Sequence, residues 1–175
     1  MEGDRGSSRA RAVAGSIGFL VIAPGVAAGI IPWLITDWDA NEWWLPLRVL
    51  GVVIAAAGLA GLLDAFARFA FEGYGTPAPV APTERLIVTG PYRYVRNPMY
   101  VAVTSLIVGQ GLYFGYAVLF AYAAAFVAVT AAFVRAYEEP VLSRTYGAEY
   151  ERYRSEVPGW RPRLTPWSPS DGDER

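Results

Sequence analysis

Two short groups of residues carry the side chains in this 175-residue chain that are best suited to chemistry. The first group is Arg96-Asn97-Pro98-Met99-Tyr100, and the second is the carboxylate pair Glu138-Glu139, which directly precedes Pro140. Arginine and asparagine side chains can bind an anion, and carboxylates can accept hydrogen bonds from hydroxyl or ammonium groups. Together the two groups predict a binding site that works through charge and hydrogen bonding.

The residue types that are missing narrow the chemistry further. The chain has no Cys and no His, and all 15 of its basic residues are Arg. Disulfides, Cys/His metal or haem sites, and Ser-His-Asp or Cys-His nucleophiles are therefore excluded. We expect no metal and no nucleic-acid partner, and a reaction that relies on carboxylates, Arg, Asn, Tyr, backbone groups or a cofactor.

The distribution of charge indicates which elements position these groups. Uncharged stretches cover residues 12–36, 49–63 and 97–134. A helical membrane span needs about 20 apolar residues, so the third stretch is too long for one span and must fold back on itself. We therefore predict an all-α fold, an integral membrane four-helix bundle whose last two helices form a hairpin. The predicted spans are 13–35, 46–69, 98–112 and 115–137.

Local sequence features refine this bundle. Pro24-Gly25 is expected to kink the first helix, because proline removes one backbone hydrogen bond. Asp64 and Arg68 are four residues apart, so we expect them to pair on one helical face. Small residues near the hairpin turn should let its two helices approach closely. These are Gly109, Gly111 and Gly115.

The positions of the arginines predict the orientation. Arginine is concentrated before the first span, in loop 72–97 and in the tail from residue 138, whereas 36–45 and 113–116 contain none. By the positive-inside rule, both termini and loop 72–97 are cytoplasmic. Tryptophans near the opposite end then form an aromatic belt at the outer face: Trp33, Trp38, Trp43 and Trp44.

The tail is expected to have an ordered and a disordered part. Pro140 should end or kink the last span beside Glu139. Residues 138–164 are interpreted as an amphipathic helix with Tyr146, Tyr150 and Tyr153 at helical spacing, followed by an anchor at Trp160-Arg161-Pro162. Residues 165–175 are expected to be disordered.

Three motifs in order around the predicted hairpin resemble a known group of enzymes. They are GYGTPAPVAP (73–82), TGPYRYVRNPMY (89–100) and YEEPVLSRTYGAEYERYRSEVPGWRP (137–162). This pattern, over about residues 68 to 164, resembles the isoprenylcysteine carboxyl methyltransferase and phospholipid N-methyltransferase superfamily. The resemblance implies an integral membrane enzyme that binds S-adenosylmethionine at the cytoplasmic end of its last two helices. It would methylate an acceptor reached from the membrane and release S-adenosylhomocysteine.

The resemblance also implies site residues. Arg96, Asn97 and Glu139 would be catalytic. The cofactor would be held by Gly90, Tyr92, Arg96, Asn97, Pro98, Tyr100, Glu138 and Glu139. Loops 73–76 and 89–92 would close over the cofactor, with Tyr92 or Tyr94 presenting its ring to adenine or to the sulfonium. One glutamate would bind the ribose hydroxyls or ammonium, and the other would hold Arg93, Arg96 or Arg135.

Asn97 marks a departure from the superfamily, whose usual motif is RHPxY. Asparagine keeps a donor and an acceptor of similar reach but cannot act as a base. Methyl transfer from a sulfonium needs little acid–base help when the acceptor is already deprotonated. The main task left to the protein is alignment of donor and acceptor in a site that excludes water.

Other interpretations remain open. Residues 96–100 could be an ordinary helix start with an interfacial Arg and Tyr, and Glu138 and Glu139 could form simple interfacial ion pairs. Residues 73–76 and 89–92 could be ordinary turns. A sterol-type reductase using NADPH shares a related hairpin, and a small four-helix transporter would need an acidic residue near mid-span, for which Asp64 is the only candidate. Under the methyltransferase interpretation, a lipid, quinone-like or small hydrophobic acceptor enters laterally past the first two helices, in a bacterial cytoplasmic membrane.

The predicted topology can be tested with a reporter fused to the C-terminus. Because the tail is expected on the cytoplasmic side, a reporter that works only in the cytoplasm should be active in cells expressing the fusion. Activity of a reporter that requires export would contradict this orientation.

Overall fold

The computed structural model describes residues 22–41, 44–72 and 86–168, and every regular element in these ranges is helical. The predicted all-α class is therefore confirmed. Two apolar helical segments are long enough to cross a membrane, Leu45–Arg68 with 24 residues and Ala117–Tyr146 with 30, while Ile22–Thr36 and Pro98–Phe114 are shorter apolar helices. The predicted loop motif at 73–76 and Trp43 lie outside the described residues.

The N-terminal helical segment contains a widened turn. The π-helical turn η1 (Val26–Ile30) leads directly into α2 (Ile31–Thr36), where Pro32 follows it. Proline lacks an N–H group and crowds the preceding turn, and a π turn relieves both problems. The widened turn therefore lies between Pro24-Gly25, which are both helical, and Pro32.

Donors from the hairpin hold this widened turn. The Tyr122 hydroxyl donates to the carbonyl oxygen of Ala27 at 2.8 Å, and the Gln110 amide donates to that of Ala28 at 2.7 Å. Carbonyl groups in and beside a π turn need such partners in an apolar environment. The N-terminal segment is thereby fixed to α4 and α5 near their connecting turn.

Helix α3 (Leu45–Glu72) packs along α4 (Pro98–Phe114) through small residues. A Cβ atom added to Gly51 would lie 2.6 Å from the Gly109 carbonyl oxygen, and one added to Gly109 would lie 2.7 Å from the Gly51 carbonyl oxygen. The two backbones are thus in direct contact. Gly109 serves the α3–α4 interface, and its predicted role between the hairpin helices is wrong.

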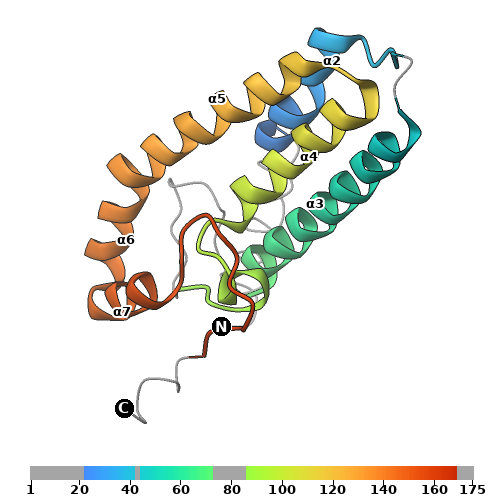
Figure 1. Ribbon diagram of the computed structural model, residues 1–175. Helices are drawn as coiled ribbons and strands as arrows, with labels where there is room; N and C mark the ends of the chain where they lie inside the picture. Colours follow the sequence, from blue (N-terminus) through green and yellow to red (C-terminus); the bar gives the residue numbers. More distant parts are fainter. Residues whose placement is uncertain (1–21, 42–43, 73–85, 169–175) are drawn as a thin grey trace, which may run out of the picture.

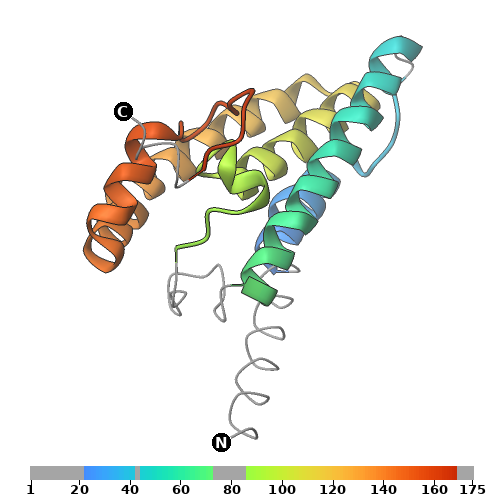
Figure 2. The same cartoon turned by 90° about the horizontal axis from the view of Figure 1, so that it is seen from below.

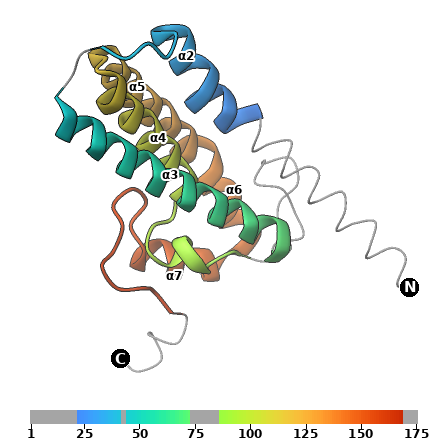
Figure 3. The same cartoon turned by 90° about the vertical axis from the view of Figure 1, so that its right-hand side faces the viewer.

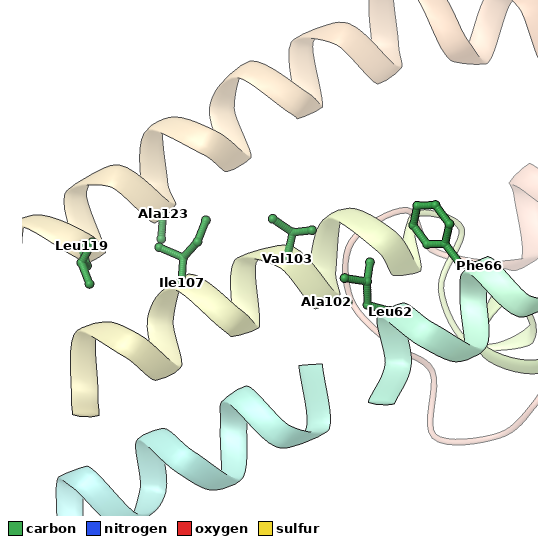
Figure 4. Packing of buried hydrophobic residues seen from close by; sticks show 7 residues of the cluster. All are labelled: Leu62, Phe66, Ala102, Val103, Ile107, Leu119 and Ala123. Atoms are coloured by element: carbon green, nitrogen blue, oxygen red, sulfur yellow. The ribbon is translucent and has the colours of Figure 1, made fainter. Parts of the chain in front are cut away.

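The hairpin joins α4 to α5 (Ala117–Phe133) through Gly115, whose φ of 76° lies in the left-handed region that favours glycine. Gly111 does face the partner helix as predicted, because an added Cβ there would lie 3.2 Å from the Phe120 ring. Helix α4 is central and contributes to the core between α3 and α5 (Figure 4). The core cluster comprises Leu62, Phe66, Ala102, Val103, Ile107, Leu119 and Ala123.

The sequence predicts that Pro140 ends or kinks the last span, and the structure has an irregular turn there without an end to the helix. A second π turn, η3 (Val134–Glu138), is followed by α6 (Glu139–Tyr146), in which Pro140 is the second residue. The Glu139 N–H donates to the carbonyl oxygen of Val134, five residues earlier. As at Pro32, the wide turn accommodates the proline without ending the helix. Glu138 and Glu139 consequently lie within a continuous helical path and not at a helix C-terminus.

The tail forms a short helix and an extended strap. Gly147, with a φ of 54°, separates α6 from α7 (Ala148–Glu156), so the predicted single tail helix is divided in two. Residues 157–168, here called the strap, then run back past the start of α4 (Figures 1 and 2). Trp167 is only 4% exposed, so the expectation of disorder from residue 165 is wrong at least as far as residue 168.

The two ends of the molecule differ in composition. Figure 3 shows α2 and the α4–α5 turn at one end, and α7 with the strap at the other. The first end includes the exposed Trp38 and Trp44. The second includes Arg96, Glu139 and Arg154. Both candidate motifs therefore lie at the same arginine-rich end.

The glycine contact between α3 and α4 predicts a specific effect on stability. Gly51→Ala places a methyl group against two backbone atoms, the Gly109 carbonyl oxygen and the Tyr113 nitrogen, which cannot move independently of their helix. We expect a loss of about 1–3 kcal/mol, measured as a lower thermal unfolding midpoint in detergent.

Gly61→Ala is the matched control, because a Cβ there meets nothing within 4 Å. It should leave the midpoint unchanged or raise it, since alanine favours helix over glycine by up to about 1 kcal/mol. Equal midpoints for the two variants would contradict the close contact.

Candidate functional site

The first motif forms the entry into α4. A 3-10 turn, η2 (Gly90–Arg93), leads to Asn97 at the N-cap and Pro98 at the first helical position, where the missing proline N–H is not needed. Residues 96 and 97 lie in irregular backbone between η2 and α4, and their backbone N–H groups donate to the strap carbonyls of Pro158 and Gly159 at 3.0 and 3.2 Å. The motif is therefore held by the tail as well as by its own helix.

Arg96 connects three elements through its guanidinium group. Its Nη1 donates to Glu139 Oε1 at 2.8 Å and to the Tyr150 hydroxyl at 3.2 Å, while its Nε donates to the Val157 carbonyl oxygen at 2.9 Å. The side chains of Arg96 and Glu139 are each only 14% exposed. Such a shielded, hydrogen-bonded ion pair is stronger than one at an open surface.

The two glutamates have different partners, as the roughly 100° between neighbouring helical residues predicts. Glu139 accepts from Arg96 and lies 3.3 Å from Arg154 Nη2. Glu138 accepts a 2.5 Å hydrogen bond from the Tyr100 hydroxyl. The Arg-Asn-Pro-x-Tyr and Glu-Glu-Pro motifs are thus joined twice, by an ion pair and by a hydroxyl–carboxylate bond.

The Asn97 side chain is bonded to the strap. Its side chain makes no cap hydrogen bond, and its Nδ2 donates to the Gly159 carbonyl oxygen at 3.0 Å. The same oxygen accepts the Asn97 backbone N–H. Asn97 therefore fastens the start of α4 to the strap.

The residues of η2 pack against α3. Tyr92 is 7% exposed and belongs to a core cluster with Ala65 and Ile87. Gly90, with a φ of 52°, leaves room for the Arg68 side chain, which is itself paired with Asp64 at 3.2 Å as predicted. These positions do not add support to the predicted cofactor contacts of Gly90 and Tyr92.

A pocket of about 450 Å³ opens beside the Arg96–Glu139 pair. Its apolar wall comes from the end of α5 and from η3, and its charged wall comes from the motifs and α7. The lining residues are Arg96, Ala131, Ala132, Val134, Arg135, Glu139, Arg154 and Trp160. Three arginines against one carboxylate favour an anionic group, and Arg135 has no acidic partner within the described ranges.

Aromatic rings border the same region. The ring centroids of Tyr100 and Trp160 are 6.1 Å apart, and those of Tyr100 and Phe126 are 6.5 Å apart. Aromatic faces near carboxylates attract cations and stack on flat ring systems. The site end thus offers surfaces for an anion, for a cation and for an aromatic group within a short distance.

Two tyrosines of the tail, Tyr150 and Tyr153, form hydrogen bonds to residues of the first motif and of η2. Burial raises the pKa of both Tyr150 and Tyr153, so both hydroxyls remain protonated at neutral pH. Tyr150 accepts from Arg96, and Tyr153 donates to the Tyr92 carbonyl oxygen at 2.6 Å. They pack together with Val157 and Trp167 in one buried cluster.

Sequence reasoning missed several residues of the site. Arg154 is one of many tail arginines, and Ala131 and Ala132 are simply the end of a predicted span. Arg135 is predicted only as a possible partner of a glutamate. Trp160 was interpreted as an anchor, and Trp167 was assigned to a disordered segment. No spacing rule within a single helix links these positions, because four separate segments bring them together.

A comparison with known families identifies a match for most of this structure. A family model described as phospholipid methyltransferase matches residues 47–149, from the first turn of α3 into α7. The match includes α3, which the sequence interpretation had placed outside the region of resemblance, and it ends before the strap. None of the curated proteins matches the chain.

Proposed function

The chain belongs to the phospholipid methyltransferase family and is a membrane methyltransferase, and from this premise we propose its donor, its acceptor class and its site. The donor is S-adenosylmethionine, and the acceptor is a lipid-like or small hydrophobic molecule at the cytoplasmic membrane face. The observation that carries the proposal is the Arg96–Glu139 ion pair, which joins the two family-like motifs at the wall of one pocket.

The residues around the pocket fit S-adenosylmethionine chemically. This molecule carries a carboxylate, an ammonium, ribose hydroxyls, an adenine ring and a sulfonium. Arg96, Arg135 and Arg154 suit the carboxylate, and Glu139 suits hydroxyl or ammonium groups. Trp160 suits the adenine or the sulfonium. When bound, the cofactor supplies a methyl group made electrophilic by the positively charged sulfur.

The chain's own contribution is binding and orientation. Arg96 is held by Glu139, Tyr150 and the Val157 carbonyl, so its direction toward the pocket is set before any ligand arrives. Tyr100 and Glu138 restrain each other in the same way on the neighbouring helical face. Preorganised charges of this kind need little rearrangement during a reaction, and no histidine base is required for an acceptor that is already deprotonated.

The acceptor class follows from the position of the pocket. Its apolar residues Ala131, Ala132 and Val134 belong to the apolar segment Ala117–Tyr146, which is long enough to cross a membrane. The small alanine side chains leave space beside the charged wall. These features support entry of a hydrophobic acceptor from the bilayer and of a soluble donor from the cytoplasmic side, where the arginine-rich end is expected.

Calorimetry with purified protein tests the donor. S-adenosylmethionine and S-adenosylhomocysteine should both bind, and NADPH should not, because the chain belongs to a family of methyltransferases. NADPH binding without S-adenosylhomocysteine binding would overturn the proposal. Transfer of labelled methyl groups from the cofactor into a lipid extract would then identify the acceptor.

Variants of the two motifs test the site. Glu139→Gln removes the charge that orients Arg96, and Asn97→Ala removes the side-chain bond to Gly159. Each should raise the Kd for S-adenosylhomocysteine at least about tenfold, equivalent to about 1.4 kcal/mol, in variants that thermal unfolding shows to be folded at the temperature of the binding measurement.

The chain offers matched controls for both substitutions. Glu149→Gln changes an exposed carboxylate on α7, and Asn41→Ala changes an asparagine at the opposite end of the molecule, where its Nδ2 lies 3.5 Å from the Gly115 carbonyl. Both controls should bind like the unaltered protein. Normal binding by Glu139→Gln and Asn97→Ala as well would show that the site lies elsewhere.

A further inference from the structure

The strap, residues 157–168, lies beyond the family match at 47–149 and yet contacts the central motif of the site. It leaves α7 at Val157, passes the start of α4 and returns to η2 (Figure 2). The segment has no regular secondary structure, so its path must be determined by its individual contacts.

Hydrogen bonds connect the strap to residues 93–97 at both of its ends. At the first end, the carbonyls of Val157, Pro158 and Gly159 accept from Arg96 and Asn97. Farther along, the Arg163 N–H donates to the Tyr94 carbonyl oxygen at 2.8 Å. At the far end, the Trp167 N–H donates to the Arg93 carbonyl oxygen at 2.9 Å, and Arg93 Nε donates to the Trp167 carbonyl oxygen at 2.6 Å.

Trp167 is the buried side chain at the far end of this connection. Its indole packs edge-on against Tyr153 with ring centroids 5.3 Å apart, and its Nε1 donates to Glu156 Oε2 at 2.7 Å. A buried tryptophan side chain contributes a large area of apolar contact. By contrast, Leu164 in the same strap is fully exposed.

The near end of the strap forms part of the pocket. Gly159 lies so close to the motif that an added Cβ would be 3.3 Å from Arg96 Nη2 and 3.4 Å from Asn97 Nδ2. Trp160, the next residue, lines the pocket. A strap released at its far end would therefore loosen both the backbone partners of Arg96 and the aromatic wall.

We propose that Trp167 is a positioning residue that latches the strap and thereby holds Arg96, Asn97 and Trp160 in place at the pocket. The part of this inference that concerns the cofactor rests on the proposed function. The latch itself does not, because it concerns hydrogen bonds within the chain.

The test compares Trp167→Ala, Trp167→Phe and Leu164→Ala in the full-length protein. Both substitutions keep the backbone bonds to Arg93 and lose the Nε1 bond to Glu156. Phenylalanine keeps an aromatic ring against Tyr153, whereas alanine removes the ring. Leu164→Ala is the control: it shortens an apolar side chain of the same strap that is fully exposed and so loses no packing contact. Two quantities are measured: amide hydrogen exchange in residues 93–97 and in the centre of α3, and the Kd for S-adenosylhomocysteine.

For Trp167→Ala we expect exchange at Arg96 and Asn97 to accelerate at least about tenfold while α3 stays protected, and the Kd to rise at least about tenfold. Trp167→Phe should remain within about threefold of the unaltered protein in both measurements, and Leu164→Ala should match it. Rescue by phenylalanine distinguishes positioning by the ring from a general loss of stability.

Unchanged exchange at Arg96 and Asn97 in Trp167→Ala would overturn the latch, whatever the cofactor result. Equal acceleration in α3 would also overturn it, because the effect would then be global unfolding. If exchange changes locally but the unaltered protein binds no S-adenosylhomocysteine, the latch stands and the proposed donor fails.

Discussion

The shielded ion pair between Arg96 and Glu139 is the interaction on which the rest of the site depends. Removing two charges from water is costly, and the cost is offset only when the remaining hydrogen-bonding groups are also satisfied. Here Tyr150 and the Val157 carbonyl complete the shell of Arg96, and Arg154 completes that of Glu139. The pair therefore requires the start of α4, the π turn before α6, α7 and the strap to be in place together.

Glycines and prolines in the helices allow the elements around this ion pair to come together. Direct contact between Gly51 and Gly109 holds α3 against α4, and α5 leans away from α4 toward its far end, beside the pocket (Figure 1). The π turn before Pro140 lets the helix continue, so that Glu138 and Glu139 face Tyr100 and Arg96 from a helical segment. The same combination of π turn and proline occurs at Pro32, where Tyr122 and Gln110 hold the freed backbone. Local irregularity in these helices is thus tied to interhelical contacts.

Much of the fold could be predicted from the sequence, because long stretches without charge and the positions of the arginines can be read directly from the order of the residues. The all-α class, the hairpin turn at Gly115 and the Asp64–Arg68 pair all depend on local spacing and are present in the structure. Predictions failed where a residue's role depended on a distant partner. Gly109 packs on α3 instead of α5, and Trp167 is buried instead of disordered.

The sequence by itself determined which side chains were available and that both motifs would face the same end of the bundle, since helix direction and charge asymmetry follow from residue order. Only the tertiary structure decided how the polar groups are paired. Glu139 binds Arg96 while Glu138 binds Tyr100, and the Asn97 amide binds the strap instead of capping its own helix. These choices involve residues about 40 to 60 positions apart. They depend on the distances and burial that result when α4, α6 and the tail pack together, which no local pattern specifies.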